Sequence, residues 1–173
     1  SLYGLKQSAR CWNLRINQIL IDSGFRRGKA ESCLYIKCKS DSIVYILIYV
    51  DDIIIASGTD AGYEGVVRTL KSNFEITELG DLTLYLGIEV NLNGSLFYLS
   101  QENYINKILN EFKLQDAKIS SIPMDPGYLK RNSENLLENN NLYRRAIGSL
   151  LYISNNTRPD IAVAVSILSR KIS

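Results

Sequence analysis

Two adjacent carboxylates interrupt the most hydrophobic stretch of this chain. Asp51 and Asp52 are preceded by the apolar residues 43–50 and followed by the apolar residues 53–56. Both flanks are short, rich in β-branched residues and free of Gly and Pro, which is typical of strands that are buried on both faces. We therefore expect a β-hairpin with the Asp pair at its bend. A tight hairpin turn favours Asn-Gly or Asp-Gly, so turn formation alone does not explain Asp-Asp.

A metal ion would explain the pair. Two neighbouring carboxylates repel each other unless a cation lies beside them. Mg²⁺ takes oxygen ligands from one or two carboxylates together with substrate phosphates, so metal-assisted phosphoryl or nucleotidyl transfer is one interpretation. The other is an acidic turn exposed to solvent, since charged side chains are usually solvated. The apolar flanks leave both interpretations open.

The motif Tyr49-Val50-Asp51-Asp52 on such a hairpin resembles the active-site motif of reverse transcriptases. Further stretches occur with it: residues 1–7 (SLYGLKQ), 79–82 (LGDL), 85–90 (YLGIEV), 99–101 (LSQ), 143–144 (YR), 148–152 (GSLLY) and 157–161 (TRPDI). In this order and at these spacings, the set is similar to the polymerase of copia-type LTR retrotransposons. The resemblance extends over essentially the whole chain.

The resemblance implies a set of site residues. Asp51 and Asp52 would be catalytic and would bind the metal, Mg²⁺ or Mn²⁺. The residues near the incoming nucleotide and template would be Gly4, Lys6, Gln7, Tyr49 and Val50. Leu86 and Gly87 would position the primer end. The structural alternatives are a helix entry with a solvated basic face for residues 4–7, and a plain hairpin with Gly at a bulge or a close crossing for the Leu-Gly pair.

The resemblance also implies a fragment. Two-metal nucleotidyl transfer needs a clamp of ligands, for which two carboxylates barely suffice. The family uses a third Asp on a strand that would precede Ser1, and the sequence begins in mid-motif without Met. We therefore expect a piece of a Pol polyprotein that is inactive alone. The alternative is a relic or co-opted module that binds nucleic acid or acts as a scaffold without catalysis.

The partners implied by the resemblance are an RNA or DNA template with its primer, deoxynucleoside triphosphates, and the rest of the polyprotein. That rest comprises the upstream palm and fingers and the downstream RNase H. No membrane partner is expected, because the longest apolar run is shorter than the ~20 residues that span a bilayer. The expected location is intracellular: the cytoplasm, virus-like particles or the nucleus.

Charge is unevenly distributed along the chain. Residues 1–40 carry eight basic and two acidic side chains, residues 41–102 carry two basic and ten acidic, and residues 103–173 carry ten basic and six acidic. An acidic centre between basic flanks suits a metal site surrounded by nucleic-acid phosphates, although such unevenness is also common in ordinary soluble domains.

The chain contains no histidine. This excludes Ser-His-Asp and Cys-His catalysis and the usual ligand sets of zinc hydrolases, so any chemistry falls to carboxylates. Cys11, Cys33 and Cys38 are odd in number and lack CxxC spacing. Neither a disulfide framework nor a structural zinc site is predicted, and a reducing compartment fits.

A chain of 173 residues with 46% hydrophobic residues can build a sizeable core. We predict an α+β fold. Residues 1–99 would form part of a polymerase palm, an antiparallel sheet with helices, and residues 100–173 a helical region like a thumb or connection.

Apolar periodicity predicts the elements of the first region. A helix carries Trp12, Ile16, Ile19 and Leu20 on one face and ends at Ser23-Gly24, and residues 33–37 form a strand. A helix capped by Asp60 carries Val66, Val67, Leu70 and Phe74 inward. Strands over residues 83–90 and 95–99 form a second hairpin across residues 91–94, because Asn-Gly is a strong hairpin signal.

In the second region, Ser100 is expected to cap a helix, and residues 132–141 are a candidate mobile loop. Helices are predicted over residues 143–153 and 159–171, the second begun by a proline. Arg144 and Arg145 would either contact phosphate or be solvated.

Overall fold

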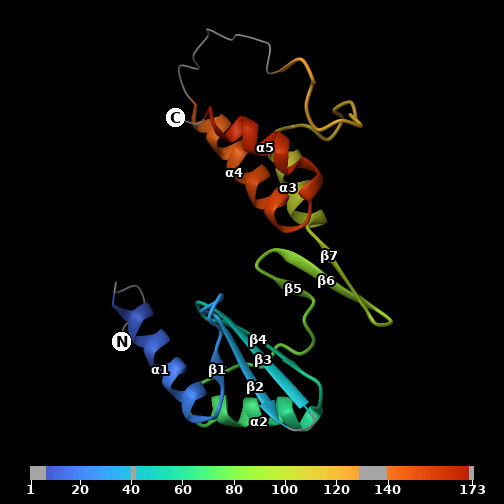
Figure 1. Cartoon of the computed structure of the whole chain (residues 1–173). Coiled ribbons are helices and arrows are strands. Elements are labelled where there is room, and N and C mark those ends of the chain that lie inside the picture. Colours follow the sequence, from blue (N-terminus) through green and yellow to red (C-terminus); the bar gives the residue numbers. More distant parts are fainter. Residues whose placement is uncertain (1–6, 40–41, 129–139, 172–173) are drawn as a thin grey trace. The chain divides into compact units, whose positions relative to one another are not determined.

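The computed structural model describes residues 7–39, 42–128 and 140–171. The chain divides into two compact units, Ser1–Gly80 and Asp81–Ser173. Their described residues hold five α-helices and two small antiparallel sheets, one sheet in each unit (Figure 1). The predicted α+β class is therefore confirmed. The assignment of residues 1–99 to a palm and of residues 100–173 to a thumb stays a prediction.

The first unit is a four-stranded antiparallel sheet with two helices. Its elements are α1 (Ser8–Asp22), β1 (Arg26–Arg27), β2 (Leu34–Lys39), β3 (Ser42–Tyr49), β4 (Asp52–Ser57) and α2 (Asp60–Lys71). The strands lie side by side in sequence order. The predicted strand over residues 33–37 corresponds to β2, and the predicted hairpin corresponds to β3 and β4.

One face of this sheet forms the core of the unit. Val44, Ile46 and Ile48 of β3 are buried in one cluster with residues of both helices, namely Ile16, Leu20, Val66 and Leu70. The intervening side chains Ile43, Tyr45 and Tyr49 are exposed, because successive side chains of a strand point to opposite faces. The expectation that these strands are buried on both faces is therefore wrong. A short apolar run does not by itself show how many faces are covered.

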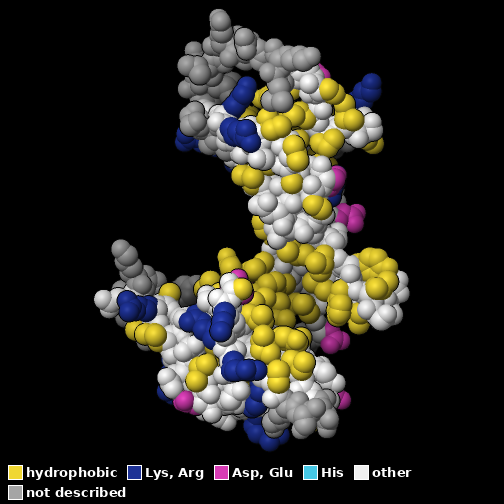
Figure 2. All heavy atoms as spheres, in the orientation of Figure 1, with side chains coloured by type: hydrophobic (Ala, Val, Ile, Leu, Met, Phe, Trp, Pro, Cys, Tyr) yellow, Lys and Arg dark blue, Asp and Glu magenta, His cyan; other side chains and the backbone are white. Residues whose placement is uncertain are grey.

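The second face of the sheet is called the open face below. Its exposed hydrophobic residues on β3 are Ile43, Tyr45 and Tyr49. Figure 2 shows that hydrophobic side chains are exposed over the sheet of this unit. β4 is an edge strand, since it pairs with β3 alone among the described strands. An apolar face beside an unpaired strand edge favours association with another chain or segment.

Local signals place the helix ends of the first unit. Ser23 is the C-cap of α1, and Gly24 follows with φ of +87°, a left-handed conformation that suits glycine, so the predicted end is confirmed. The predicted cap of α2 is wrong by one residue. Thr59 is the N-cap, and its hydroxyl accepts a hydrogen bond from the N–H of Gly62 at 3.2 Å. Asp60 is the first helical residue, where its charge suits the helix dipole.

The second unit consists of a three-stranded antiparallel sheet followed by helices. Its elements are β5 (Leu84–Tyr85), β6 (Ile88–Asn93), β7 (Leu96–Ser100), α3 (Glu102–Glu111), α4 (Asn141–Asn156), the 3₁₀-helix η2 (Pro159–Ile161) and α5 (Ala162–Ser169). Its buried hydrophobic residues include Val90 of the sheet and Ile147, Ile153, Ala164 and Val165 of the helices. The helices predicted after Ser100 and over residues 143–153 and 159–171 are confirmed.

The predicted second hairpin is present, but its turn lies elsewhere. β6 continues to Asn93, which pairs with Leu96, so the turn residues are Gly94 and Ser95 and not residues 91–94. Gly94 has the positive φ of +61° that such turns favour. The predicted strand over residues 83–90 is also interrupted by a reversal between β5 and β6, so a single continuous strand is wrong.

The start of α3 is held by side chains that precede it. The Ser100 hydroxyl accepts a hydrogen bond from the N–H of Glu102 at 3.1 Å, as expected of a cap, although Gln101 is the N-cap residue. Gln101 is 1% exposed, and its side-chain amide oxygen accepts a hydrogen bond from the Thr157 hydroxyl at 2.7 Å. This partly buried contact joins α3 to the segment that follows α4.

The candidate mobile loop over residues 132–141 lies outside the described residues, apart from its last two positions. Within the ranges that the structure describes, no helix combines the length and the apolar character needed to cross a membrane.

Candidate active site

Asp51 and Asp52 lie at the tip of the β3–β4 hairpin. Tyr49, the last residue of β3, pairs with Asp52, the first residue of β4. Val50 and Asp51 are therefore the two turn residues. The predicted bend is confirmed, with the correction that only one member of the Asp pair lies in the turn. Cross-strand partners share a face of a sheet, so Asp52 lies with Tyr49 on the open face.

The backbone at Val50 is strained. Its φ is +54°, whereas Asp51 is not among the described residues with positive φ. A positive φ at the first position of a two-residue turn is the pattern of a type II′ turn, which normally takes glycine there. A β-branched residue in this region is an outlier that costs of order 1–3 kcal/mol. The surrounding structure must therefore hold this conformation.

Both carboxylates are accessible. Asp51 and Asp52 are exposed, and no hydrogen bond or ion pair engages either side chain in the part of the chain that the structure describes. Tyr49 and Val50 beside them are 52% and 61% exposed. Two neighbouring carboxylates without a counter-charge repel each other and favour a bound cation. The tip therefore presents two oxygen donors that are free to bind one.

The remaining residues of the predicted nucleotide and template group are placed only in part. Gln7 is exposed and is the N-cap of α1. Gly4 and Lys6 lie outside the described residues. Of this group, the structure brings Tyr49 and Val50 together with the Asp pair on one hairpin.

Trp12 joins α1 to this hairpin tip. Its indole N–H donates a hydrogen bond to the carbonyl of Val50 at 2.7 Å. Its ring lies edge-to-face on Phe74, with the ring centroids 4.9 Å apart, and packs against the core cluster of the unit. From the apolar periodicity of α1, Trp12 was expected only on the apolar face of its helix. An indole N–H usually finds a hydrogen-bond partner when it is buried, and that requirement was the available signal for a second role.

Leu86 and Gly87 form the turn between β5 and β6. Tyr85 pairs with Ile88, and the two turn residues have φ of +51° and +79°. Two positive φ values are the pattern of a type I′ turn, in which glycine is favoured. The pair is thus the tight turn of a plain hairpin, and the glycine does not lie at a bulge. Its role in positioning a primer stays a prediction.

Tyr152 of α4 holds this second turn. Its hydroxyl donates a hydrogen bond to the carbonyl of Leu86. Its ring lies edge-to-face on Tyr104 of α3, with the ring centroids 4.9 Å apart. A Cβ atom on Gly87 would lie 3.1 Å from the Tyr152 hydroxyl, so glycine also permits this close approach. Sequence reasoning missed Tyr152, because nothing local to the motif indicates its partner.

The donor set at the β3–β4 tip fits part of a divalent metal centre. Hard cations such as Mg²⁺ bind carboxylate oxygens, which Asp51 and Asp52 supply. Across residues 7–39, 42–128 and 140–171, no group of three or more His, Cys, Asp or Glu side chains could hold a metal ion. The remaining ligands would have to come from substrate phosphates, water or a further carboxylate.

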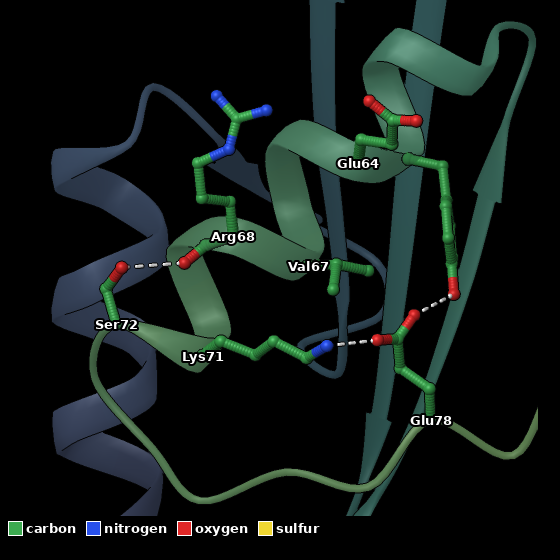
Figure 3. Close-up of a pocket in the computed structure, with 7 residues that line it drawn as sticks. Glu64, Val67, Arg68, Lys71, Ser72 and Glu78 are labelled. Atoms are coloured by element: carbon green, nitrogen blue, oxygen red, sulfur yellow. Dashed lines mark hydrogen bonds and ion pairs between the residues drawn. The ribbon is translucent and has the colours of Figure 1, made fainter.

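A separate pocket lies along α2 (Figure 3). It is lined by Tyr63, Glu64, Val67, Arg68, Lys71, Ser72 and Glu78. Glu78 forms an ion pair with Lys71 and accepts a hydrogen bond from the Tyr63 hydroxyl at 3.0 Å. The Lys71 contact, followed by that of Tyr63, lowers the pKa of Glu78. The pocket contains none of the predicted site residues, and its central acid is already paired.

Arg145, one of the two arginines considered for phosphate contact, has a partner that an ion pair identifies. Arg145 of α4 forms an ion pair with Glu111 at the end of α3. This pair joins two helices of the second unit, so Arg145 has a structural contact of its own.

Comparison with known proteins identifies the family. Residues 1–126 match a family model described as reverse transcriptase (RNA-dependent DNA polymerase). The chain is 34% identical over 172 residues to a putative transposon Ty5-1 protein of Saccharomyces cerevisiae, an alignment that covers 98% of the chain and 56% of the relative. No solved structure gives a significant match.

Two further relatives are retrovirus-related Pol polyproteins from plant transposons. The chain is 34% identical to that of RE1 from Arabidopsis thaliana and 34% identical to that of TNT 1-94 from Nicotiana tabacum, with 98% of the chain covered in both cases. It spans only 12% and 14% of their lengths. The chain therefore belongs to the reverse transcriptase family of retrotransposon Pol polyproteins, and the resemblance drawn from its motifs is confirmed.

Proposed function

We propose that Asp51 and Asp52 supply two of the metal-binding carboxylates of an RNA-directed DNA polymerase. The observation that carries this proposal is the accessible Asp pair, unpaired among the described residues, at a strained hairpin tip in a member of the reverse transcriptase family. The alternative of an incidental acidic turn would not require a valine with positive φ beside the carboxylates.

The divalent ions, Mg²⁺ or Mn²⁺, would supply charge stabilisation for the triphosphate and activation of the primer 3′ oxygen. The role of this chain would be to bind these ions. Asp52 is fixed at the start of a strand and Asp51 by the turn, so both donors extend from a rigid hairpin. A third carboxylate would come from outside residues 1–173.

The other predicted site residues would act around these two. Gly4, Lys6, Gln7, Tyr49 and Val50 would lie near the incoming nucleotide and template, and the Leu86-Gly87 turn would position the primer end. Template and primer would be bound mainly through phosphates, so binding should be independent of sequence and should weaken as salt rises from about 50 to 200 mM. The partners remain deoxynucleoside triphosphates and the rest of a Pol polyprotein.

The experiment extends the chain upstream through the strand that bears the third Asp and measures primer extension on an RNA template with Mg²⁺ or Mn²⁺. The extended protein should be active, and residues 1–173 alone should be inactive. Asp51→Asn should reduce extension by about 100-fold or more, the scale of losing one preorganised charge-stabilising group. Its binding of primer and template should be nearly unchanged, since the carboxylate acts on the metals.

Asp60→Asn is the matched control, because Asp60 is an exposed Asp of the same unit that is not part of the motif. It should leave extension unchanged. Equal loss in both variants, or extension by residues 1–173 alone that Asp51→Asn abolishes, would contradict the proposal. An extended protein that binds primer and template but never extends them would favour the co-opted binding module.

A further inference from the structure

The strained turn at the Asp pair accepts a hydrogen bond from a side chain that is distant in sequence. The carbonyl of Val50 accepts the indole N–H of Trp12 at 2.7 Å, across 38 residues of sequence. Val50 is 61% exposed and has φ of +54°. A strained conformation persists only where the surrounding structure enforces it. Among the described residues, this is the side-chain hydrogen bond that Val50 receives, and it adds to the strand pairing that closes the turn.

Trp12 is itself fixed from two sides. Its ring is held edge-to-face by Phe74, at 4.9 Å between centroids and an interplanar angle of 69°. One and two turns further along α1, Ile16 and Leu20 are both 0% exposed within the core cluster. The helix therefore cannot slide without opening the core. The indole donor is therefore held at a set position by a ring that packs against the buried core of the unit.

We infer that Trp12 is a positioning residue for the metal-binding carboxylates. The peptide group that follows Val50 carries both the carbonyl that Trp12 holds and the N–H of Asp51. If the donor is lost, the peptide groups on both sides of Val50 can rotate, Val50 can relax to negative φ, and the Asp51 carboxylate is aimed differently relative to Asp52. Because Trp12 is packed against the core, its hydrogen bond fixes the backbone conformation of the hairpin tip. The inference rests on the proposed function, because it assumes that the two carboxylates bind metal.

The indole N–H of Trp12 can be observed directly by NMR, because Trp12 is the single tryptophan of the chain. Its indole N–H gives one resonance in a ¹H–¹⁵N spectrum of residues 1–173, which needs no mutagenesis for assignment. That N–H should exchange slowly with solvent because it is hydrogen-bonded. Mn²⁺ bound at the neighbouring turn should broaden the resonance, whereas Mg²⁺ should shift it without broadening.

The decisive variant is Trp12→Phe, which keeps an aromatic ring against Phe74 but removes the donor. Its Mn²⁺ affinity should fall about threefold to tenfold, the scale of one hydrogen bond. The resonances of Val50 and Asp51 should shift and broaden while those of Ile16 and Leu20 stay in place. Phe74→Leu is the matched control, because it removes the ring contact but keeps the donor. Its loss of Mn²⁺ affinity should be less than half of the loss in Trp12→Phe.

The outcomes separate this inference from the proposed function. If the unaltered chain binds no Mn²⁺ at the turn, the metal-binding proposal fails. If the unaltered chain binds Mn²⁺ there and Trp12→Phe binds it equally well, Trp12 is a packing residue and the inference is wrong. Rapid solvent exchange of the indole N–H in the unaltered chain would also overturn it.

Discussion

The two tight turns at Val50-Asp51 and Leu86-Gly87 have two features in common and differ most at their second position. In each, the first position is a non-glycine residue with positive φ, +54° for Val50 and +51° for Leu86. In each, the carbonyl of that residue accepts a hydrogen bond from an aromatic side chain on a helix, Trp12 or Tyr152. The second position is Asp51 in one turn and Gly87 in the other.

This difference shows what each turn is selected for. The Leu86-Gly87 turn has, at its second position, the glycine that a type I′ turn favours, so local preference accounts for that position. The Val50-Asp51 turn has neither glycine nor asparagine, so local preference opposes it. We attribute its residues to the metal-binding role proposed for Asp51. On this account, the Tyr152 hydroxyl adds stability to a turn that already has a favourable glycine. The Trp12 indole is needed to hold a turn that local preference opposes.

The largest expected effect of the stability tests is that of Gly87→Ala. The substitution places a Cβ atom at φ of +79° and within 3.1 Å of the Tyr152 hydroxyl. It should lower the free energy of unfolding of the second unit by about 1–2 kcal/mol, measured by urea denaturation followed through amide resonances of that unit.

The control for this substitution is Gly148→Ala in α4. No atom lies within 4 Å of a Cβ added there, and the position is helical. Alanine should stabilise it by up to about 1 kcal/mol. Equal destabilisation by both substitutions would show that Gly87 has no special conformational role.

Tyr152→Phe is expected to have the next largest effect. It removes the hydroxyl that donates a hydrogen bond to the Leu86 carbonyl, and it keeps the ring against Tyr104. A loss of about 1 kcal/mol in the stability of the second unit follows from one hydrogen bond. Tyr98→Phe, on an exposed tyrosine of β7, should change the stability by less than half as much. Indistinguishable values for the two variants would remove Tyr152 from the comparison.

Val50→Gly should act in the opposite direction to Gly87→Ala. It releases the strain of a β-branched residue at positive φ, which is partly offset by the greater backbone entropy of glycine when unfolded. The first unit should gain less than about 1 kcal/mol of stability. Urea unfolding followed by Trp12 fluorescence measures it. A loss of stability would mean that the valine side chain contributes packing that outweighs its strain.

The smallest effect is expected from Glu89 at low pH. The backbone N–H of Asn103 donates to its carboxylate at 3.0 Å, and this contact, followed by that of Ser100, lowers the pKa of Glu89 below its ordinary value of 4.5. The charged form is thus favoured in the folded state. Its contribution is present above pH 4.5 and is lost as the pH falls through the lowered pKa.

An acid titration of the second unit measures this contribution. Glu89→Gln should make its unfolding less dependent on pH below 4.5 than that of the unaltered chain. An identical acid titration for both proteins would show that the contact between the Glu89 carboxylate and the start of α3 adds nothing to the stability of the second unit.

Local patterns predicted the elements of this fold well. The β3–β4 hairpin, α1, α2 and the helices of the second unit follow from apolar periodicity and capping signals that act within about one helical turn. The break at Leu86-Gly87 was missed because the apolar alternation continues on both sides of it. The exposure of the second face of β3 was missed because an apolar strand does not reveal what covers it.

The candidate site was predictable only where its chemistry lies within a motif. Asp51 and Asp52 are adjacent in sequence, and their environment of apolar strands is visible there. The hydrogen bonds from Trp12 and Tyr152 span 38 and 66 residues. No periodicity encodes contacts of that separation, so they emerge only when the helices are packed.

The central claim, that Asp51 and Asp52 bind divalent metal, is tested most directly by titrating residues 1–173 with Mn²⁺ and mapping the broadened amide resonances. Binding should be weak, because two carboxylates leave most of the coordination sphere to water. Broadening should centre on Tyr49 to Ile53, and the double variant Asp51→Asn with Asp52→Asn should abolish it. Unchanged affinity in the double variant, or broadening centred on Glu64 and Glu78 of the α2 pocket, would contradict the account.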